Sequence, residues 1–176
     1  MAEVLVVGDA IIDFVFADID RYPDPGEELI APRYELRPAG SAGYAAAGLG
    51  ALDEAVSVST VVGDDLLSDH WIEFVTSCGV DTSHVTRLED ERVSAAAAFL
   101  FPGERSFVTY RGANTVDTTP VPSPEGYDAV LVTGYSQAPY LWNRELLAFC
   151  WEADRLDIPV YLDTNWSEGG WQSTRS

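Results

Sequence analysis

The sequence predicts an α/β fold with a mostly parallel sheet and two hairpins outside it. Short apolar runs alternate along the chain with segments of helical periodicity, which is typical of parallel strands joined by right-handed crossovers. Two pairs of strand-like segments flank turn sequences that contain Pro and Gly, and they interrupt this alternation. These pairs indicate the hairpins.

The first expected strand and the first hairpin lie near the N-terminus. Residues 4–7 are apolar on both faces, as in a central strand of a parallel sheet, and Gly8 ends the run. Residues 11–17 and 28–36 alternate like strands, and the Pro-Asp-Pro-Gly sequence at 23–26 between them is a strong turn signal. We expect these two segments to pair.

A helix, a strand and a second helix are expected next. Residues 41–52 place small and apolar side chains at helical spacing, with Ser41 as the candidate N-cap. Residues 56–62 form a second apolar strand. Residues 66–78 are amphipathic and predict a helix that Gly79 stops at its C′ position.

The second hairpin is expected around the Pro-Gly-Glu-Arg sequence at 102–105. It would pair residues 93–101 with residues 106–110. Residues 115–127 contain three prolines and form the expected connector back to the core.

The last part of the chain returns to the alternating pattern. Residues 130–133 are a third apolar strand, residues 143–156 a helix, and residues 158–162 a fourth strand entered through Pro159. In parallel sheets, ligands bind beyond the carboxyl ends of the strands, so the residues just after each strand are the first candidates for a site.

The charge of the chain is unusual. It contains 29 Asp and Glu residues against 10 basic residues, all of them Arg, and its formal net charge is −19. The acids are scattered rather than gathered in a tail. We favour the hydrated surface of a protein from a high-salt cytoplasm, where salt screens self-repulsion, over an acidic binding face or a partly disordered chain.

This composition also limits the partners. Nucleic acid is not an expected partner, because phosphate binding needs a basic patch. The chain starts on a strand without a basic signal region and has no apolar run long enough to span a bilayer, so we expect a cytoplasmic protein that binds no membrane. His70 and His84 lack partners at metal spacing, and no metal site is expected.

Several polar residues after the strands could form a site. Asp13 could accept hydrogen bonds from two neighbouring sugar hydroxyls, or it could simply form a turn. Gly40 and Ser41 open a helix, whose free N–H groups would point at a ligand, and Gly40 would allow close approach of the backbone. The Asn114 amide could contact a ligand or form a local turn.

Two further turns follow later strands. The Gly-Asp-Asp sequence at 63–65 favours a structural turn with a helix N-cap. Asp163 and Asn165 follow the last strand and could contact a ligand, although Asp163 could equally cap the next segment. A dinucleotide-binding oxidoreductase is disfavoured, because the first strand is not followed by a GxGxxG sequence.

In order and spacing, these motifs resemble the ribokinase or PfkB family of carbohydrate kinases over residues 4–171. The matching segments are 8–13, 23–27, 39–40, 61–65, 78–82, 103–107, 110–114 and 163–165 with Trp171. The resemblance implies transfer of the γ-phosphoryl group of ATP, with Mg²⁺, to a hydroxymethyl group of a small-molecule sugar or related alcohol.

The resemblance also implies a domain organisation. A ribokinase-like three-layer α/β/α core would comprise residues 1–10, 39–92 and 115–176, and a small β-sheet lid over the sugar would comprise roughly residues 11–38 and 93–114. The candidate substrate-binding residues are Asp13, Ala39, Gly40, Ser41, Tyr44, Asn114, Gly134, Asp163 and Asn165.

The chain departs from the family pattern at several positions. Ile11 stands where the family often has Asn, Ala39 replaces the first Gly of a Gly-Gly pair, Tyr44 replaces an Asn, and Ser167 stands at an Arg position. Two polar sugar contacts thus become apolar or bulky. This predicts a substrate larger or less polar than ribose, which could stack on Tyr44.

No Gly-Ala-Gly-Asp sequence, which carries the catalytic Asp in the family, occurs in the 176 residues. We therefore expect the N-terminal, sugar-binding portion of a carbohydrate kinase, with most of the nucleotide site missing and no activity alone. The alternative is a non-catalytic sugar-binding or dimerisation module, which pairs through the lid or with a missing C-terminal half. Exposure of Trp166, Trp171 and the strand at 160–162 would favour the first hypothesis.

Overall fold

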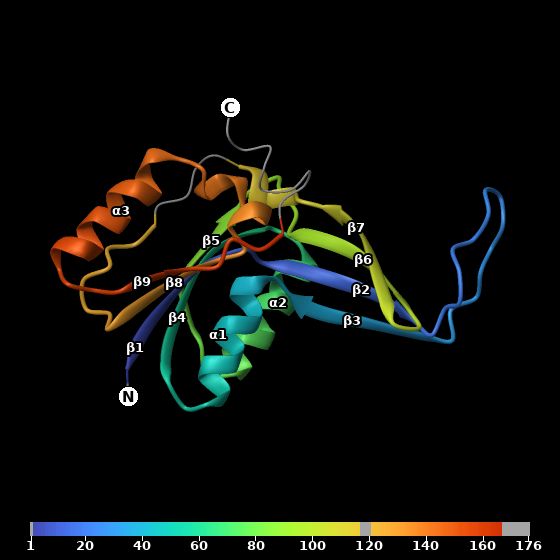
Figure 1. Cartoon of the computed structure of the whole chain (residues 1–176), viewed down its shortest axis with the longest axis horizontal. Coiled ribbons are helices and arrows are strands. Elements are labelled where there is room, and N and C mark those ends of the chain that lie inside the picture. Colours follow the sequence, from blue (N-terminus) through green and yellow to red (C-terminus); the bar gives the residue numbers. More distant parts are fainter. Residues whose placement is uncertain (1, 117–120, 167–176) are drawn as a thin grey trace.

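The structure is a computed structural model that describes residues 2–116 and 121–166, and in this part of the chain a five-stranded parallel sheet forms the core (Figure 1). The strand order is β5-β4-β1-β8-β9, and every neighbouring pair is parallel, as the sequence predicts. The strands are β1 (Glu3–Gly8), β4 (Ala55–Gly63), β5 (Asp81–Leu88), β8 (Ala129–Thr133) and β9 (Val160–Leu162).

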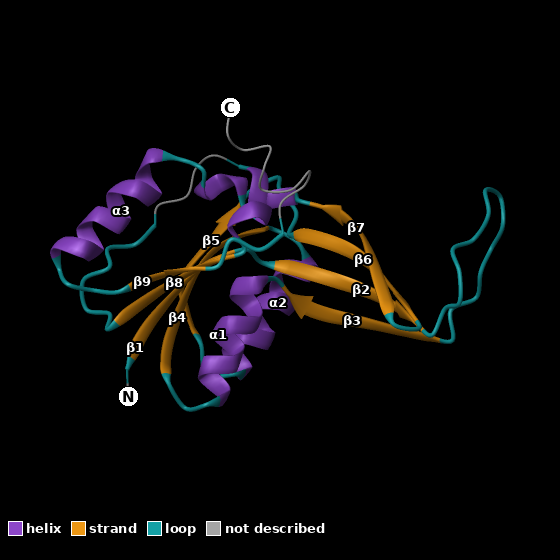
Figure 2. Cartoon of the chain, viewed as in Figure 1, coloured by secondary structure: helices purple, strands orange, loops and turns teal. Residues whose placement is uncertain are grey.

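Helices cover both faces of this sheet and give the expected three layers (Figure 2). Helices α1 (Ser41–Ala51) and α2 (Leu66–Ser77) lie on one face, and α3 (Arg144–Arg155) lies on the other. Three short 3₁₀ helices complete the described elements: η1 (Gly112–Thr115), η2 (Tyr135–Gln137) and η3 (Pro139–Leu141). None of the helices within the described ranges is long and apolar enough to cross a membrane.

The apolar character of both faces of β1 follows from this arrangement. Successive side chains of a strand point to opposite faces. Val6 packs in the cluster that contains Trp71 of α2, whereas Leu5 and Val7 pack in the cluster that contains Phe149 of α3. Each face therefore needs its own apolar set, as the run at 4–7 suggests.

The two predicted hairpins combine into one smaller mixed sheet, called the lid sheet here. Its order is β3-β2-β6-β7, and its strands are β2 (Ile11–Ala17), β3 (Arg33–Ala39), β6 (Ser94–Phe101) and β7 (Glu104–Tyr110). The β2–β3 and β6–β7 pairs are antiparallel hairpins, and β2 and β6 pair in parallel to join them. The loop between β2 and β3 projects beyond the sheet (Figure 1).

Two expectations about elements are wrong. The sequence pattern did not predict β5, because this edge strand carries polar residues such as Ser83, Thr86 and Arg87 instead of an apolar run. Ser41 is not the N-cap of α1; Gly40 occupies that position, and no side chain of its own caps the helix. The end of α2 is as predicted, with Gly79 at a φ of 84°.

Candidate functional site

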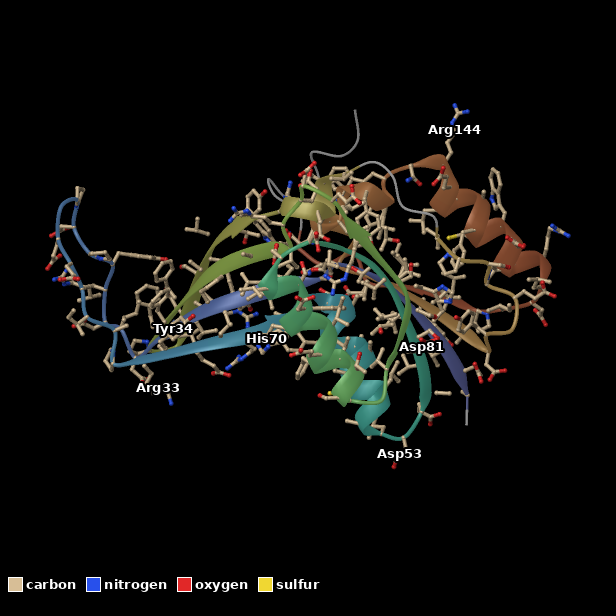
Figure 3. The ribbon with its side chains drawn as sticks, turned by 180° about the vertical axis from the view of Figure 1, so that it is seen from behind. Arg33, Tyr34, Asp53, His70, Asp81 and Arg144 are labelled. Atoms are coloured by element: carbon tan, nitrogen blue, oxygen red, sulfur yellow. The ribbon has the colours of Figure 1, made fainter. Side chains whose placement is uncertain are left out.

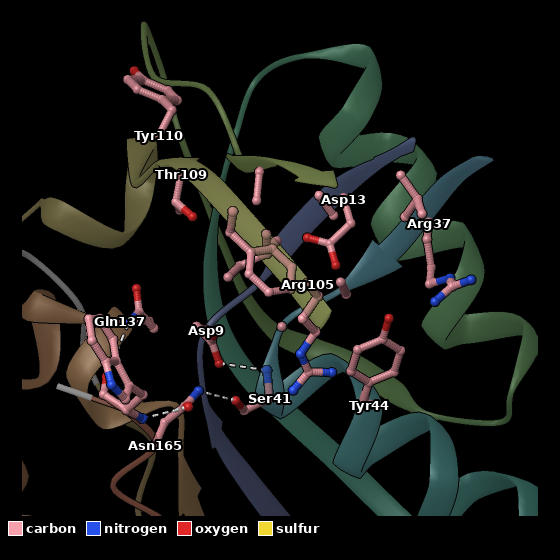
Figure 4. Close-up of a pocket in the computed structure, with 18 of the residues that line it drawn as sticks. Asp9, Asp13, Arg37, Ser41, Tyr44, Arg105, Thr109, Tyr110, Gln137 and Asn165 are labelled. Carbon is pink, nitrogen blue, oxygen red and sulfur yellow. Dashed lines mark hydrogen bonds between the residues drawn. The ribbon is translucent and has the colours of Figure 1, made fainter. Parts of the chain in front are cut away.

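A cleft of about 1350 Å³ lies between the lid sheet and the N-terminus of α1 (Figure 4). Six of the nine predicted site residues line it: Asp13, Ala39, Gly40, Ser41, Tyr44 and Asn165. The lining also includes residues that the sequence analysis did not select: Asp9, Val15, Arg37, Ala96, Ala98, Leu100, Arg105, Ser106, Phe107, Thr109, Tyr110, Arg111, Gln137 and Trp166. Three distant parts of the chain therefore meet in one cavity.

The register of the lid sheet explains why these side chains face the cleft together. Asp13 pairs with Arg37 of β3 and with Ala96 of β6, and Ala96 pairs with Thr109 of β7. Paired residues in neighbouring strands share a face, so these four form one row across the sheet. The next row towards the β6–β7 turn contains Val15, Ala98 and Phe107, and a further row contains Leu100 and Arg105.

Small residues in β6 make the middle of this surface concave. Ala96 and Ala98 end at their methyl groups, while larger side chains stand on either side of them, Arg37 from β3 and Phe107 from β7. The alanine run of β6 is therefore the floor of the cleft. Replacing these methyl groups by large side chains would fill the space in which a ligand could lie.

Asp13 is a half-buried carboxylate on β2 that lines the cleft beside Ala96 of this floor. Burial raises the pKa of Asp13 above its usual range, and the neighbouring positive charge of Arg37 opposes that shift. Burial also raises the pKa of Tyr44, as does the negative charge of Asp13. In this partly desolvated position, a carboxylate gains from hydroxyl donors that a ligand would bring.

The turn before α1 has a backbone that glycine alone accommodates well. Gly40 has a φ of 93°, and a Cβ at this position would lie 2.4 Å from the carbonyl oxygen of Asp9. From the α2 side, the indole Nε1 of Trp71 donates a hydrogen bond of 2.8 Å to the carbonyl oxygen of Ala39. These contacts fix the position of the turn where it lines the cleft.

Asp9 lies outside α1, and its side chain accepts hydrogen bonds from amides at the N-terminus of this helix. Its Oδ1 accepts hydrogen bonds from the amides of Ser41 (2.8 Å) and Ala42 (3.3 Å), and its side chain is 1% exposed. Burial raises the pKa of Asp9 to about 6, although these hydrogen bonds lower it, and Asp163 raises it further. The amides of Ser41 and Ala42 are therefore not free to contact a ligand, contrary to our expectation.

The turn after β9 closes the side of the cleft beside α1. The Nδ2 of Asn165 donates a hydrogen bond of 2.9 Å to the hydroxyl oxygen of Ser41. Asp163 instead forms a local turn, because its Oδ1 accepts from the amide of Asn165 at 3.0 Å and its Oδ2 from the hydroxyl of Thr133 at 3.1 Å. Of this pair, Asn165 lines the cleft and Asp163 does not.

Two other predicted site residues support the cleft from behind. Asn114 is buried, and its Nδ2 donates to the carbonyl oxygen of Ala10 (3.2 Å) and to the hydroxyl oxygen of Ser94 (3.0 Å). Gly134 has a φ of 68°, and a Cβ there would lie 1.9 Å from Oδ1 of Asp9. Neither lines the cleft. The motif positions Ser167 and Trp171 lie outside the described residues.

The comparisons with known proteins agree with this architecture. A family model described as pfkB family carbohydrate kinase matches residues 1–174. The chain is 26% identical over 113 residues to the deoxyribokinase of Salmonella typhi, a match that covers 64% of this chain and 37% of that protein. It is 25% identical over 169 residues to the ribokinase of Bacillus subtilis, a match that covers 93% of this chain and 55% of that protein.

A solved structure gives the same result for the fold. The structure of Arabidopsis thaliana ribokinase complexed with ribose and ATP superposes with a TM-score of 0.75 at 22% identity, and covers 93% of this chain and 54% of that one. The chain thus spans 37% to 55% of the length of these relatives. The α/β core with its separate small sheet is ribokinase-like. Because the family model matches nearly the whole sequence, the chain belongs to the pfkB family of carbohydrate kinases.

Proposed function

We propose that this chain binds a sugar or related polyol in the cleft, as the acceptor of a phosphoryl group from ATP. The observation that carries the proposal is the position of Asp13, a half-buried carboxylate that lines the cleft beside Ala96. Two oxygens of one carboxylate can accept hydrogen bonds from adjacent hydroxyl groups. A polyol supplies such a pair of donors at a fixed spacing.

The surrounding residues suit the rest of such a ligand. Gly40 lines the cleft with its backbone, and Ser41 and Asn165 add polar atoms beside it. Tyr44 and Phe107 offer aromatic surface to the C–H face of a sugar. These residues would bind and orient the acceptor, so that its hydroxymethyl group faces the phosphoryl donor.

The described residues fit the nucleotide and its metal less well than the acceptor. Within residues 2–116 and 121–166, no group of three or more His, Cys, Asp and Glu side chains could hold a metal ion. The N-terminus of α1, which could otherwise bind a phosphate, already has two amides bonded to Asp9. We therefore assign ATP and Mg²⁺ to the family reaction and derive no step through them from these residues.

Calorimetry of polyol binding to Asp13→Asn tests the proposed role. Removing the charge of an acceptor for two hydroxyl groups should weaken binding of ribose and of larger polyols by about 10- to 100-fold, because hydrogen bonds to charged groups contribute about 1.5–3 kcal/mol. Asp53→Asn is the matched control, since Asp53 is exposed in the turn after α1 (Figure 3). Equal affinity of the Asp13 variant and the original chain would refute the proposal.

An assay with ATP and Mg²⁺ tests the expectation that the 176-residue chain is inactive alone. Formation of a phosphorylated polyol would contradict this expectation. Polyol binding without product is expected both for the sugar-binding portion of a kinase and for a non-catalytic sugar-binding module.

A further inference from the structure

Asn114 is a predicted site residue that does not line the cleft. It lies in η1 and is fully buried. Its Nδ2 donates hydrogen bonds to the carbonyl oxygen of Ala10 (3.2 Å) and to the hydroxyl oxygen of Ser94 (3.0 Å). The hydroxyl of Ser94 in turn donates to the carbonyl oxygen of Arg111. Because this donation uses the hydroxyl proton, Ser94 must accept from the Asn114 amide, and the orientation of the amide is fixed.

These partners lie where the chain passes between the core and the lid sheet. The lid sheet joins the core through four connections: residues 9–10 before β2, residue 40 after β3, residues 89–93 before β6 and residue 111 after β7. Ala10 and Arg111 belong to two of these connections, and Ser94 directly follows a third. Asn114 therefore binds three of the four, two directly and one through the hydroxyl of Ser94.

The fourth connection lies beside the first. A Cβ on Gly40 would lie 2.4 Å from the carbonyl oxygen of Asp9 and 3.1 Å from the amide nitrogen of Ile11. The amide of Ala113, next to Asn114, donates a hydrogen bond of 2.8 Å to the carbonyl oxygen of Arg92, just before β6. The four connections thus meet in one place, which we call the base of the lid sheet.

The orientation of the lid sheet depends on this base. Beyond it, the sheet has a small apolar cluster of its own, formed by Val15, Ala17 and Ala98, that is separate from the two core clusters. The sheet extends away from the core (Figure 1). Asp13 lies about 10 Å along β2 from Ala10, so a rotation of roughly 5° at the base would move it by about 1 Å. Binding groups need to be held within about 0.5 Å of their productive positions.

We propose that Asn114 is a positioning residue that sets the orientation of the lid sheet on the core, and thereby the affinity of the cleft for a polyol. This inference rests on the proposed function. The two N–H groups of one amide donate in fixed directions, so they hold two connections at a defined separation. Ala10 and Ser94 are themselves buried, so water does not readily replace the bonds that they would lose.

Hydrogen exchange of backbone amides in Asn114→Ala tests the effect on the lid sheet. Amides in the pairing of residues 11–16 with residues 94–99 should exchange about 10-fold faster or more, whereas amides of β1 and β4 should change by less than about 3-fold. Val130→Ala is the matched control, because Val130 is buried in the core cluster around Phe149 and does not line the cleft. It should increase exchange in both sheets alike, through a general loss of stability.

Calorimetry with ribose and with sorbitol tests the effect on affinity. Asn114→Ala should bind these probes about 10-fold more weakly than the original chain, and Val130→Ala should bind them equally well. Ser94→Ala is a milder variant, because it keeps the bond between Asn114 and Ala10, and it should change exchange and affinity in the same direction by less. The double variant should lose less than the sum of the two single losses, because both residues act through one hydrogen-bond network.

Two results would overturn the inference. Equal increases of exchange in the lid sheet and the core of Asn114→Ala would mean that Asn114 contributes only to overall stability. Affinities of Asn114→Ala and Ser94→Ala within about 2-fold of the original value would mean that polyol binding does not depend on this network. If Asn114→Ala does not fold, the same comparisons on Ser94→Ala decide.

Failure of the proposed function gives a different result. If the original chain binds neither ribose nor sorbitol, the proposed function fails and the claim about affinity fails with it. The exchange experiment then still decides whether Asn114 orients the lid sheet, because it needs no ligand.

Discussion

At the scale of single residues, Asp9 shows how one buried carboxylate organises the cleft. It accepts hydrogen bonds from the first amides of α1 and packs against Gly134, where a Cβ would lie 1.9 Å from its Oδ1. Neither role is visible in the sequence, because Asp9 and Ser41 are separated by 32 positions. The cleft therefore depends on Asp9, which directly follows the first strand. The sequence motifs indicate Asp13, and not Asp9, as a site residue.

Asp9→Asn should change how stability depends on pH. The pKa of Asp9 is about 6 in the folded chain against an ordinary 3.8, so the unfolded chain loses this proton first as pH rises. The stability that protonated Asp9 contributes is full below about pH 4 and is lost as pH rises through 6, at a cost of about 3 kcal/mol. Asn cannot ionise, so the variant should gain about this much relative to the original chain between pH 4 and 7.

Urea titrations at several pH values measure this difference. Asp53→Asn removes one exposed acidic residue and controls for the change in net charge. If the free energy of unfolding depends on pH in the same way for the original chain and for Asp9→Asn, Asp9 does not have the raised pKa.

Gly40→Ala should destabilise the chain by about 2 kcal/mol or more. Its φ of 93° is unfavourable for alanine, and the added Cβ would meet the carbonyl oxygen of Asp9 at 2.4 Å. Gly48→Ala is the matched control: Gly48 lies inside α1 with no atom within 4 Å of an added Cβ, so this change should stabilise the helix by up to about 1 kcal/mol. Thermal unfolding compares the two, and equal effects would contradict the account of the turn.

At the scale of elements, the sequence predicts the helices and strands whose residue pattern is visible within one segment of the chain. Helices α1, α2 and α3, both hairpins and four of the five core strands were expected within a few residues of their observed limits. Edge strand β5 was missed, because polar residues replace the apolar pattern there. The parallel pairing of β2 with β6 joins residues about 80 positions apart, and no local pattern encodes it.

The same distinction between local and long-range features explains which residues of the site could be predicted from the sequence. Residues at strand ends and helix starts, such as Asp13 and Gly40, could be selected from motifs, and they line the cleft. Arg37 and Thr109 enter the cleft only through the register of the lid sheet, which no local pattern in the sequence encodes. Asn114 also matches a family motif, but its side chain is buried and does not line the cleft.

Asp65 links two elements and gives a test at this scale. Its Oδ1 caps α2 through the amides of Leu67 and Ser68, both at 2.9 Å, and its Oδ2 accepts from the amide of Val93 at 3.0 Å, just before β6. The turn at 63–65 is thus structural, as predicted. Asp65→Ala should cost about 2–3 kcal/mol of unfolding free energy, because both the cap and the link to the lid sheet are lost.

Asp64→Ala is the control for this change, because Asp64 is the exposed neighbour in the same turn. Chemical denaturation should show less than about 0.5 kcal/mol for this variant. A similar loss for both variants would mean that the acidic turn acts through its charge and not through the Asp65 hydrogen bonds.

At the scale of the whole molecule, the net charge of −19 dominates the surface. The four ion pairs among the described residues involve four of the ten arginines, so most acidic residues have no compensating charge nearby. Self-repulsion of this size destabilises a compact state unless salt screens it. A high-salt origin therefore stays a prediction that can be tested on the chain.

The thermal midpoint of unfolding should rise by 10 °C or more between 0.1 and 2 M KCl. The physical reason is that the Debye length falls from about 10 Å to below 3 Å over this range. The increase should be smaller at pH 4, where many carboxylates are protonated. A midpoint that does not depend on KCl concentration would argue against adaptation to salt.

The central claim is that a polyol binds between the lid sheet and α1, and amide chemical-shift mapping tests it most directly. The labelled chain is titrated with ribose and with gluconate while its amide resonances are followed. The account predicts that the largest shifts fall on Asp13, Gly40, Ser41 and Thr109, which line the cleft. Shifts confined to the separate groove lined by Leu146 and Leu162, or no saturable shifts at all, would contradict it.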